Sequence, residues 1–198
     1  MELYIVRHGE TDWNKLKRFQ GNIDIELNEK GRELAGLLGA RFEKENITFE
    51  RIYSSPLNRA YETACLIRGH QNVKIFRDER LKEISFGGME GTFYDDWMNT
   101  DNPRKYFFSN AALYVPPEGG ESFPHLMERT KAFVQNEIEP LYKDYGDKKI
   151  LLVAHGALIA GLTCYLENRD VENYWGKGLK GNCEETIYIF DGKSWSLK

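Results

Sequence analysis

Two segments near opposite ends of the chain share one arrangement, in which a short apolar run leads to a histidine followed by glycine. The first run, residues 3–6, leads through Arg7 into His8-Gly9, and the second, residues 149–154, leads directly into His155-Gly156. Each run has the length and the apolar, β-branched content of a buried strand. In an open α/β sheet, ligands bind at the carboxyl ends of the strands. We therefore expect both histidines at the ligand-binding edge of one sheet.

Strand-like and helix-like segments alternate along the rest of the chain. We expect further strands at 51–53, 73–76 and 186–190, and helices at 29–46, 56–64, 123–141 and 157–166, with a kink or end at Pro140. This alternation favours an α/β fold, a three-layer sandwich with a mostly parallel central sheet and helices on both faces. Residues 1–198 are expected to form one domain.

The stretch from about 92 to 121 is irregular and aromatic, and we expect a small insertion with short helices there. Its aromatic side chains either line a substrate pocket or make a small core, and for any one of them the core is favoured.

Two of the expected helices carry specific signals. Asn28 is a good N-cap for the helix at 29–46. The residues spaced for one buried face of that helix are Leu34, Leu37, Leu38, Arg41 and Phe42. Pro56, after two serines, is typical of the first turn of the next helix. Arg59 then lies in that first turn, off the apolar stripe, near the end of the strand at 51–53. A second arginine would thus point toward the same edge of the sheet as Arg7.

The composition is that of a globular protein and excludes several other classes. The chain has 198 residues, 41% hydrophobic and 29% charged, which is enough to bury a core unaided. Its cysteines show neither zinc-site nor disulfide spacing: Cys65, Cys164 and Cys183. A formal net charge of −4 without a basic block excludes a nucleic-acid surface, and no apolar run is long enough to span a membrane. We expect a cytoplasmic protein, and protein partners are not predicted.

Two arginines and two histidines are expected at the carboxyl ends of different strands: Arg7, His8, Arg59 and His155. Arg7-His8 alone would also fit an exposed turn, but the agreement of the whole set favours a site. Arginine grips phosphate through paired donors and opposes a divalent cation, so the set favours a phosphate site over a metal site. One neutral imidazole can attack phosphorus while the arginines and a protonated His155 stabilise the transferring group. A carboxyl group with a pKa raised by burial would protonate the leaving oxygen.

The run from Arg7 to Thr11, with Trp13-Asn14 after it, resembles the signature of the histidine phosphatase superfamily, in its phosphoglycerate mutase-like branch. Further matches follow in the family's order: Gln20-Gly21, residues 54–57 with Arg59-Ala60, Leu81 with Glu83, Gly87 with Glu90-Gly91, residues 117–122, and Ala154-His155-Gly156. The resemblance covers nearly the whole chain. Its ordered set of motifs is far more specific than the triplet Arg7-His8-Gly9 alone.

The resemblance implies a role for each matching residue. His8 would be the nucleophile that becomes phosphorylated, and Glu83 would be the proton donor, in preference to Glu90, which matches a structural position of the family. The phosphoryl group would be held by Arg7, Arg59 and His155, and the phosphate and its entrance would be lined by Asn14, Gln20, Gly21 and Gly156. No metal and no cofactor are implied.

The family contains both phosphatases and mutases, which differ in whether water reaches the phosphohistidine. The family's mutases use extra basic residues in a longer insertion, whereas this insertion has only the basic pair Arg104-Lys105. We therefore favour a metal-independent phosphatase for a small phosphorylated metabolite. The alternatives are a phosphoglycerate mutase that depends on 2,3-bisphosphoglycerate, an α-ribazole phosphatase of cobalamin synthesis and, remotely, an inactive phosphate-binding interaction protein.

Overall fold

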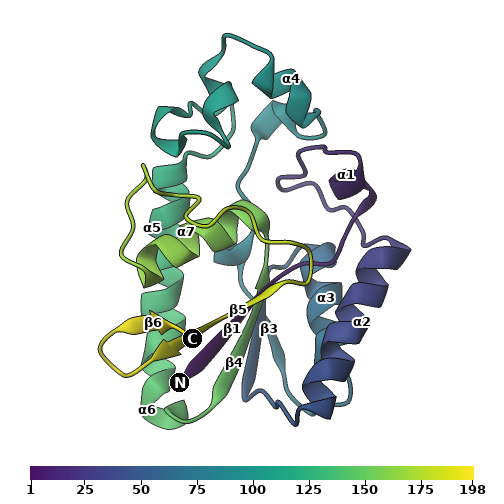
Figure 1. Cartoon of the computed structure of the whole chain (residues 1–198), viewed down its shortest axis with the longest axis vertical. Coiled ribbons are helices and arrows are strands. Elements are labelled where there is room, and N and C mark those ends of the chain that lie inside the picture. Colours follow the sequence, from purple (N-terminus) through teal and green to yellow (C-terminus); the bar gives the residue numbers. More distant parts are fainter.

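A mixed sheet of six strands runs through the middle of the molecule in the computed structural model, which describes residues 1–198 (Figure 1). Its strands, in the spatial order β3-β2-β4-β1-β5-β6, are β1 (Glu2–Arg7), β2 (Arg51–Ser54), β3 (Ile75–Arg77), β4 (Lys149–Ala154), β5 (Glu185–Phe190) and β6 (Trp195–Leu197). The pairs β1–β4, β2–β4 and β2–β3 are parallel, and β1–β5 and β5–β6 are antiparallel. The mostly parallel sheet is confirmed. β3 begins later than predicted, and β6 was not predicted.

The two strands that precede the histidines lie side by side at the centre of the sheet. In the parallel register of β1 and β4, Arg7 is paired with Ala154, and the His8 amide donates to the Ala154 carbonyl at 2.9 Å. His8 and His155 therefore leave the sheet together at its carboxyl edge. The expected convergence of the two segments is confirmed at the level of the backbone.

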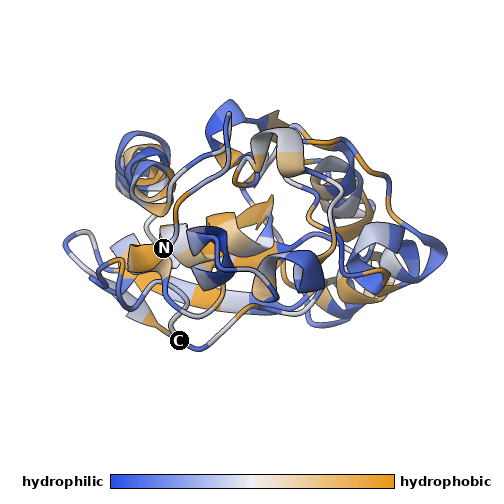
Figure 2. Ribbon diagram, turned by 90° about the horizontal axis from the view of Figure 1, so that it is seen from above, coloured by the Kyte–Doolittle hydropathy of each residue, from blue (hydrophilic) through white to orange (hydrophobic).

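Helices cover both faces of the sheet, as predicted. Alternate residues of β1 point to opposite layers: Leu3 and Ile5 pack with α5 (Phe123–Phe133) and α7 (Gly156–Leu166), and Tyr4 and Val6 pack with α2 (Glu29–Lys44) and α3 (Asn58–Arg68). The shorter helices are α1 (Asp12–Lys15), α4 (Tyr94–Met98) and α6 (Tyr142–Tyr145). Figure 2 shows hydrophobic residues gathered mainly toward the centre and hydrophilic residues mainly around the rim.

The buried face of α2 agrees with the predicted one only in part. Asn28 caps the helix as expected, and Leu38 and Phe42 are buried as predicted. Leu37, however, is 59% exposed and Leu34 is only half-buried. Small residues face α3 instead, because the two helices lie so close that a Cβ on Gly39 would come within 2.7 Å of the Leu66 carbonyl oxygen. The close approach of the two backbones therefore decides which residues of α2 face α3.

The other predicted helices also differ from the structure in where they begin and how they end. α3 begins at Asn58 with an extended Leu57 as N-cap, so Pro56 precedes the helix instead of lying in its first turn. The long helix changes after Phe133 into a π-helical turn and then a 3-10 turn around Pro140. Proline has no amide hydrogen to continue the α-helical ladder, which explains the break that was predicted there.

The stretch 92–121 has the irregular structure that was predicted. It contains α4 and two 3-10 turns, Pro103–Tyr106 and Ala111–Leu113. No helix in the chain combines the length and the apolar character that crossing a bilayer requires. The assignment of residues 1–198 to one domain stays a prediction.

Candidate active site

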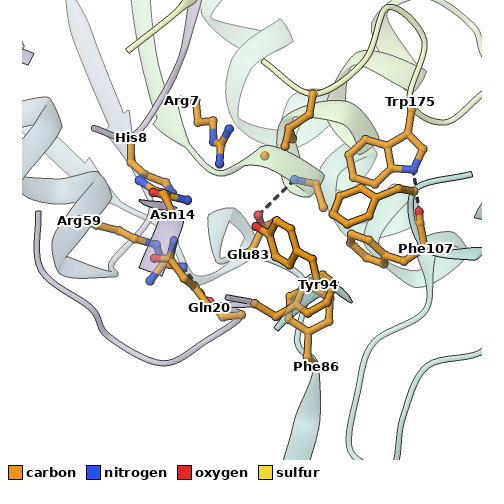
Figure 3. A pocket seen from close by; sticks show the side chains of 16 residues that line it. Arg7, His8, Asn14, Gln20, Arg59, Glu83, Phe86, Tyr94, Phe107 and Trp175 are labelled. Carbon is orange, nitrogen blue, oxygen red and sulfur yellow. Dashed lines mark hydrogen bonds between the residues drawn. The ribbon is translucent and has the colours of Figure 1, made fainter. Parts of the chain in front are cut away.

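A pocket opens near the carboxyl edge of the sheet (Figure 3), and its space, counted with the open mouth, is about 410 Å³. Most of the predicted site residues line it: Arg7, His8, Asn14, Gln20, Gly21, Arg59, Glu83 and Gly156. His155 is fully buried beside it, with its ring centroid 5.1 Å from that of His8. The structure thus brings together residues from β1, α3, α7 and the loops between them.

His8 is held as a neutral imidazole. Its Nδ1 lies 2.7 Å from the Gly9 carbonyl oxygen, so Nδ1 carries the hydrogen and donates it, which leaves the lone pair of Nε2 free. Burial, followed by the charges of Arg59 and Arg7, lowers the pKa of His8 well below its ordinary value. A Cβ on Gly9 would lie 2.6 Å from the Gly31 carbonyl oxygen, so this tight turn requires glycine.

Arg59 is fully buried, although the sequence indicated a side chain outside the apolar stripe. Its Nη1 and Nη2 donate to the carbonyls of Ile23 and Gly21 at 2.8 and 2.7 Å, and its Nε donates to His155 Nδ1 at 3.2 Å. Burial lowers the pKa of Arg59 to about 10, so the guanidinium keeps its charge at neutral pH. These bonds compensate part of the cost of burying that charge.

His155 differs from the protonated side chain expected from the sequence. Its Nδ1 accepts from Arg59, so in the neutral ring the hydrogen sits on Nε2, which is buried and has no partner within the protein. Burial and then the charge of Arg59 lower the pKa of His155 well below its ordinary value. In this structure His155 is a neutral hydrogen-bond donor rather than a cation.

Arg7 is positioned by the loop that precedes β5. Its Nη1 donates to the Lys180 carbonyl at 2.6 Å, and the Cys183 amide donates to the Arg7 carbonyl at 3.0 Å. Asn182 donates from Nδ2 to the His8 carbonyl at 2.8 Å. The sequence did not predict that this loop helps to form the site. Two of its three contacts use backbone groups, which leave no sequence signal, and Asn182 belongs to no recognised motif.

Glu83 faces the pocket and is fixed by backbone amides. Its Oε1 accepts from Leu158 at 2.9 Å and Ile84 at 3.0 Å, and its Oε2 accepts from Ala157 at 3.1 Å, so the first turn of α7 holds both oxygens. Glu90 does not line the pocket. It accepts from the amide of Asn22 instead, at 2.8 Å. Of the two carboxylates weighed from the sequence, Glu83 is therefore the one at the site.

The loop after β1 contributes polar groups. Asn14 Oδ1 accepts hydrogen bonds from the Thr11 amide and hydroxyl, both at 3.1 Å. The NH₂ group of Asn14 can therefore donate to a ligand. The Oε1 atom of Gln20 is buried without a partner. Gly21 has φ +52°, and a Cβ there would lie 2.1 Å from Glu90 Oε1, so only glycine fits beneath the pocket rim.

The rest of the pocket is aromatic. Six rings line it: Phe19, Phe86, Tyr94, Phe107, Phe108 and Trp175. Three of them come from the insertion, where Trp97 and Tyr114 are instead buried in the core. Phe19, Phe86 and Trp175 were not predicted as site residues, because each lies in an irregular segment and none is itself part of a recognised motif.

The structure contains no group of three or more His, Cys, Asp or Glu side chains that could hold a metal ion. The absence of a metal requirement stays a prediction.

The sequence matches the model of the histidine phosphatase superfamily (branch 1) over residues 3–198. It is 28% identical over 207 residues to phosphoserine phosphatase 1 of Hydrogenobacter thermophilus, covering 100% of this chain and 91% of that protein. It is 34% identical over 205 residues to phosphoglycerate mutase-like protein 4 of Arabidopsis thaliana, covering 100% and 83%. Among solved structures, Bacillus stearothermophilus YhfR matches with a TM-score of 0.87 at 33% identity, covering 99% of this chain and 94% of that one.

Proposed function

Because the chain belongs to the histidine phosphatase superfamily, branch 1, and is therefore a phosphoryl-transfer enzyme, we propose that His8 carries the phosphoryl group while the phosphomonoester of a small metabolite is hydrolysed. The observation that carries this proposal is the state of His8. It is a neutral imidazole whose Nε2 is free, in a pocket that also contains the guanidinium groups of Arg7 and Arg59.

In the first step, the lone pair of His8 Nε2 attacks phosphorus and forms a P–N bond while the ester P–O bond breaks. Arg7, Arg59 and the NH₂ group of Asn14 hold the non-bridging oxygens, where negative charge gathers in the transition state. The His155 Nε2 hydrogen is a further donor to the same group. Glu83 gives its proton to the departing oxygen, which leaves as an alcohol.

In the second step, a water molecule attacks the phosphorus of the phosphohistidine. The Glu83 carboxylate takes a proton from that water, the P–N bond breaks and its electron pair returns to His8 Nε2. Inorganic phosphate leaves and the site is restored. Gln20 and Gly21 line the entrance, and Gly156 at the start of α7 offers its backbone to the phosphate.

A phosphoglycerate mutase is the competing candidate, because the same residues would serve it. The basic pair of the insertion, which could bind a glycerate, lies outside the pocket. Arg104 packs over the Trp97 ring at 5.9 Å from its centroid, and Lys105 lies 3.9 Å from Asp101. This arrangement favours the phosphatase. An α-ribazole phosphatase is one specific form of that proposal.

The test is to incubate the protein, in a strong chelator, with an aryl phosphate and separately with 3-phosphoglycerate plus a trace of 2,3-bisphosphoglycerate. We expect release of phosphate from the aryl ester and no such release by His8→Ala. Formation of 2-phosphoglycerate without free phosphate would identify a mutase instead. Loss of activity in chelator, with recovery on adding a divalent ion, would contradict the metal-free mechanism.

A further inference from the structure

The pocket has an aromatic wall, which we define as Phe19, Phe86, Tyr94, Phe107, Phe108 and Trp175. We propose that this wall binds the leaving group of the substrate, and that this group is an uncharged alcohol with an aromatic or other apolar body. The inference rests on the phosphatase function proposed above, because it concerns the alcohol part of the phosphate ester that this function would hydrolyse.

The wall lies where the leaving group must lie. In Figure 3, His8 and Arg59 are on one side of Glu83, and Phe107 and Trp175 are on the other. An in-line attack from His8 sends the leaving oxygen away from the imidazole and toward the proton donor. The carbon attached to that oxygen then continues past Glu83 to the wall.

The wall is already assembled in the structure. Its rings contact one another in a continuous chain, with neighbouring centroids between 4.4 and 5.9 Å apart. Trp175 Nε1 donates to the Phe107 carbonyl at 2.8 Å, which fixes the C-terminal loop against the insertion. Since the rings hold one another in place, a flat apolar group can bind without first ordering them.

No cation lines the pocket at this end. The positively charged residues in the lining are Arg7 and Arg59, which face the phosphoryl end and bind backbone carbonyls. The remaining polar group on the wall is the hydroxyl of Tyr94, whose pKa burial raises, so it stays neutral. Ala157 and Leu179 add further apolar surface.

A polar groove adjoins the pocket at Glu83, but its cations are already paired. Arg129 donates to both oxygens of Glu121, at 2.7 and 2.8 Å, and His125 lies 2.7 Å from the same carboxylate. Lys82 lies 2.8 Å from Glu79. A substrate carboxylate placed there would have to displace one of these acidic partners.

A leaving group that carries a carboxylate or a second phosphate therefore fits poorly. On the wall, such a group would lose its water, find no opposite charge and lie near the Glu83 carboxyl group. Phosphoserine, phosphoglycerate and bisphosphoglycerate all carry such a group. The substrate of this chain is accordingly of a different class from the one that names its Hydrogenobacter relative.

The direct test compares esters of primary alcohols, whose leaving oxygens have similar basicity. The probes are 2-phenylethyl phosphate, propyl phosphate and the phosphate ester of 3-hydroxypropanoate, in which a carboxylate takes the place of the ring. We expect kcat/KM to be about 10- to 100-fold higher for the phenyl ester than for the carboxylate ester, from burial of one ring. Calorimetric binding of the same esters to His8→Ala should follow the same order.

Variants of Phe108, a half-buried residue of the pocket lining, test whether the wall causes this preference. Phe108→Ala should lower kcat/KM about tenfold for the phenyl ester and less than about threefold for propyl phosphate. Phe108→Arg should raise activity on the carboxylate ester by supplying the missing cation. Leu113→Ala, at an exposed site of the same insertion outside the pocket, is the matched control and should change neither.

The outcomes separate the inference from the proposed function. Hydrolysis of all three esters with equal kcat/KM, or a preference for the carboxylate ester, would overturn the inference and leave the phosphatase in place. If no ester is hydrolysed, the proposed function fails. Binding to His8→Ala then decides the inference alone, and it is overturned if the carboxylate ester binds as tightly as the phenyl ester.

Discussion

The two ends of the pocket are built in different ways. At the phosphoryl end, the guanidinium groups of Arg7 and Arg59 are held by backbone carbonyls, and between the two ends the Glu83 side chain is held by backbone amides. At the other end, the aromatic wall is held mainly by rings packing against rings. Main-chain hydrogen bonds fix a geometry that one chemical step needs, whereas packing fixes a shape that many side chains could supply. Changes at the first end should therefore alter the rate for every ester, and changes at the second should alter which ester is preferred.

The largest expected effect is at the nucleophile. His8→Ala should lower kcat by at least about 10⁴-fold for every ester, because no other group in the proposed mechanism attacks phosphorus. Steady-state phosphate release measures this loss. If His8→Ala slowed only some esters, the division between the two ends would be wrong.

The second effect tests whether Glu83, between the two ends, is the proton donor. Glu83→Gln should slow alkyl phosphates by about 10²- to 10³-fold and activated aryl phosphates by less than about tenfold, since a good leaving group needs no proton. The ratio of the two losses is the measurement. Equal losses would move the proton donor elsewhere. Glu128→Gln, at an exposed site outside the pocket lining, is the matched control.

The third effect concerns stability at the phosphoryl end. The pKa values of His8 and His155 are lowered in the folded protein, so the unfolded chain binds more protons below its ordinary pKa of about 6.5. The stability they contribute is complete above pH 6.5 and is lost as the pH falls below it, by about 1.4 kcal/mol per pH unit for each histidine. Denaturant unfolding from pH 7 to 5 should show a shallower loss in His155→Gln than in the wild type. An unchanged slope would contradict the buried neutral state.

The fourth effect tests the loop before β5. Asn182→Ala removes the donor to the His8 carbonyl and to Asn14 Oδ1, at 2.8 and 3.4 Å. We expect kcat to fall about three- to tenfold with KM unchanged, because these hydrogen bonds position the loop that contains His8. Asn72→Ala, at an exposed site outside the pocket lining, is the control. A rise in KM without a change in kcat would assign Asn182 to substrate binding instead.

The smallest effect is expected within the wall. Trp175→Phe keeps an aromatic ring but removes the hydrogen bond to the Phe107 carbonyl, which should cost about 1 kcal/mol of unfolding free energy. The order of ester preference should persist, because the wall remains apolar. A reversal of preference in this variant would mean that the hydrogen bond, rather than the packing, defines the wall.

The phosphoryl end could be predicted because its residues follow strong local signals. The apolar runs that become β1 and β4 place His8 and His155 at one edge, and the match to the family adds Glu83 and Asn14. The sequence did not indicate the protonation state of His155. The lowered pKa of His155 results first from its burial and then from the charge of Arg59, which donates to it from α3.

The aromatic wall could be predicted only in part. Phe107 and Phe108 lie in a segment recognisably rich in aromatic residues, but Phe19, Phe86 and Trp175 come from separate loops without periodicity. Their meeting depends on long-range packing. The same limit applies to α2, where the spacing predicts the burial of Leu38 and Phe42 correctly but not the exposure of Leu37. The close approach of α3 decides the rest of the buried face.

Chemical trapping of the phosphorylated enzyme tests directly whether His8 is the nucleophile. The wild-type protein is mixed with 2-phenylethyl phosphate, quenched in alkali within one turnover, digested and analysed by mass spectrometry. We expect one phosphoryl group, stable in base and labile in acid, on the peptide that contains His8, and none in His8→Ala. Phosphate release without any phosphorylated peptide, or a phosphoryl group on another residue, would contradict the proposed mechanism.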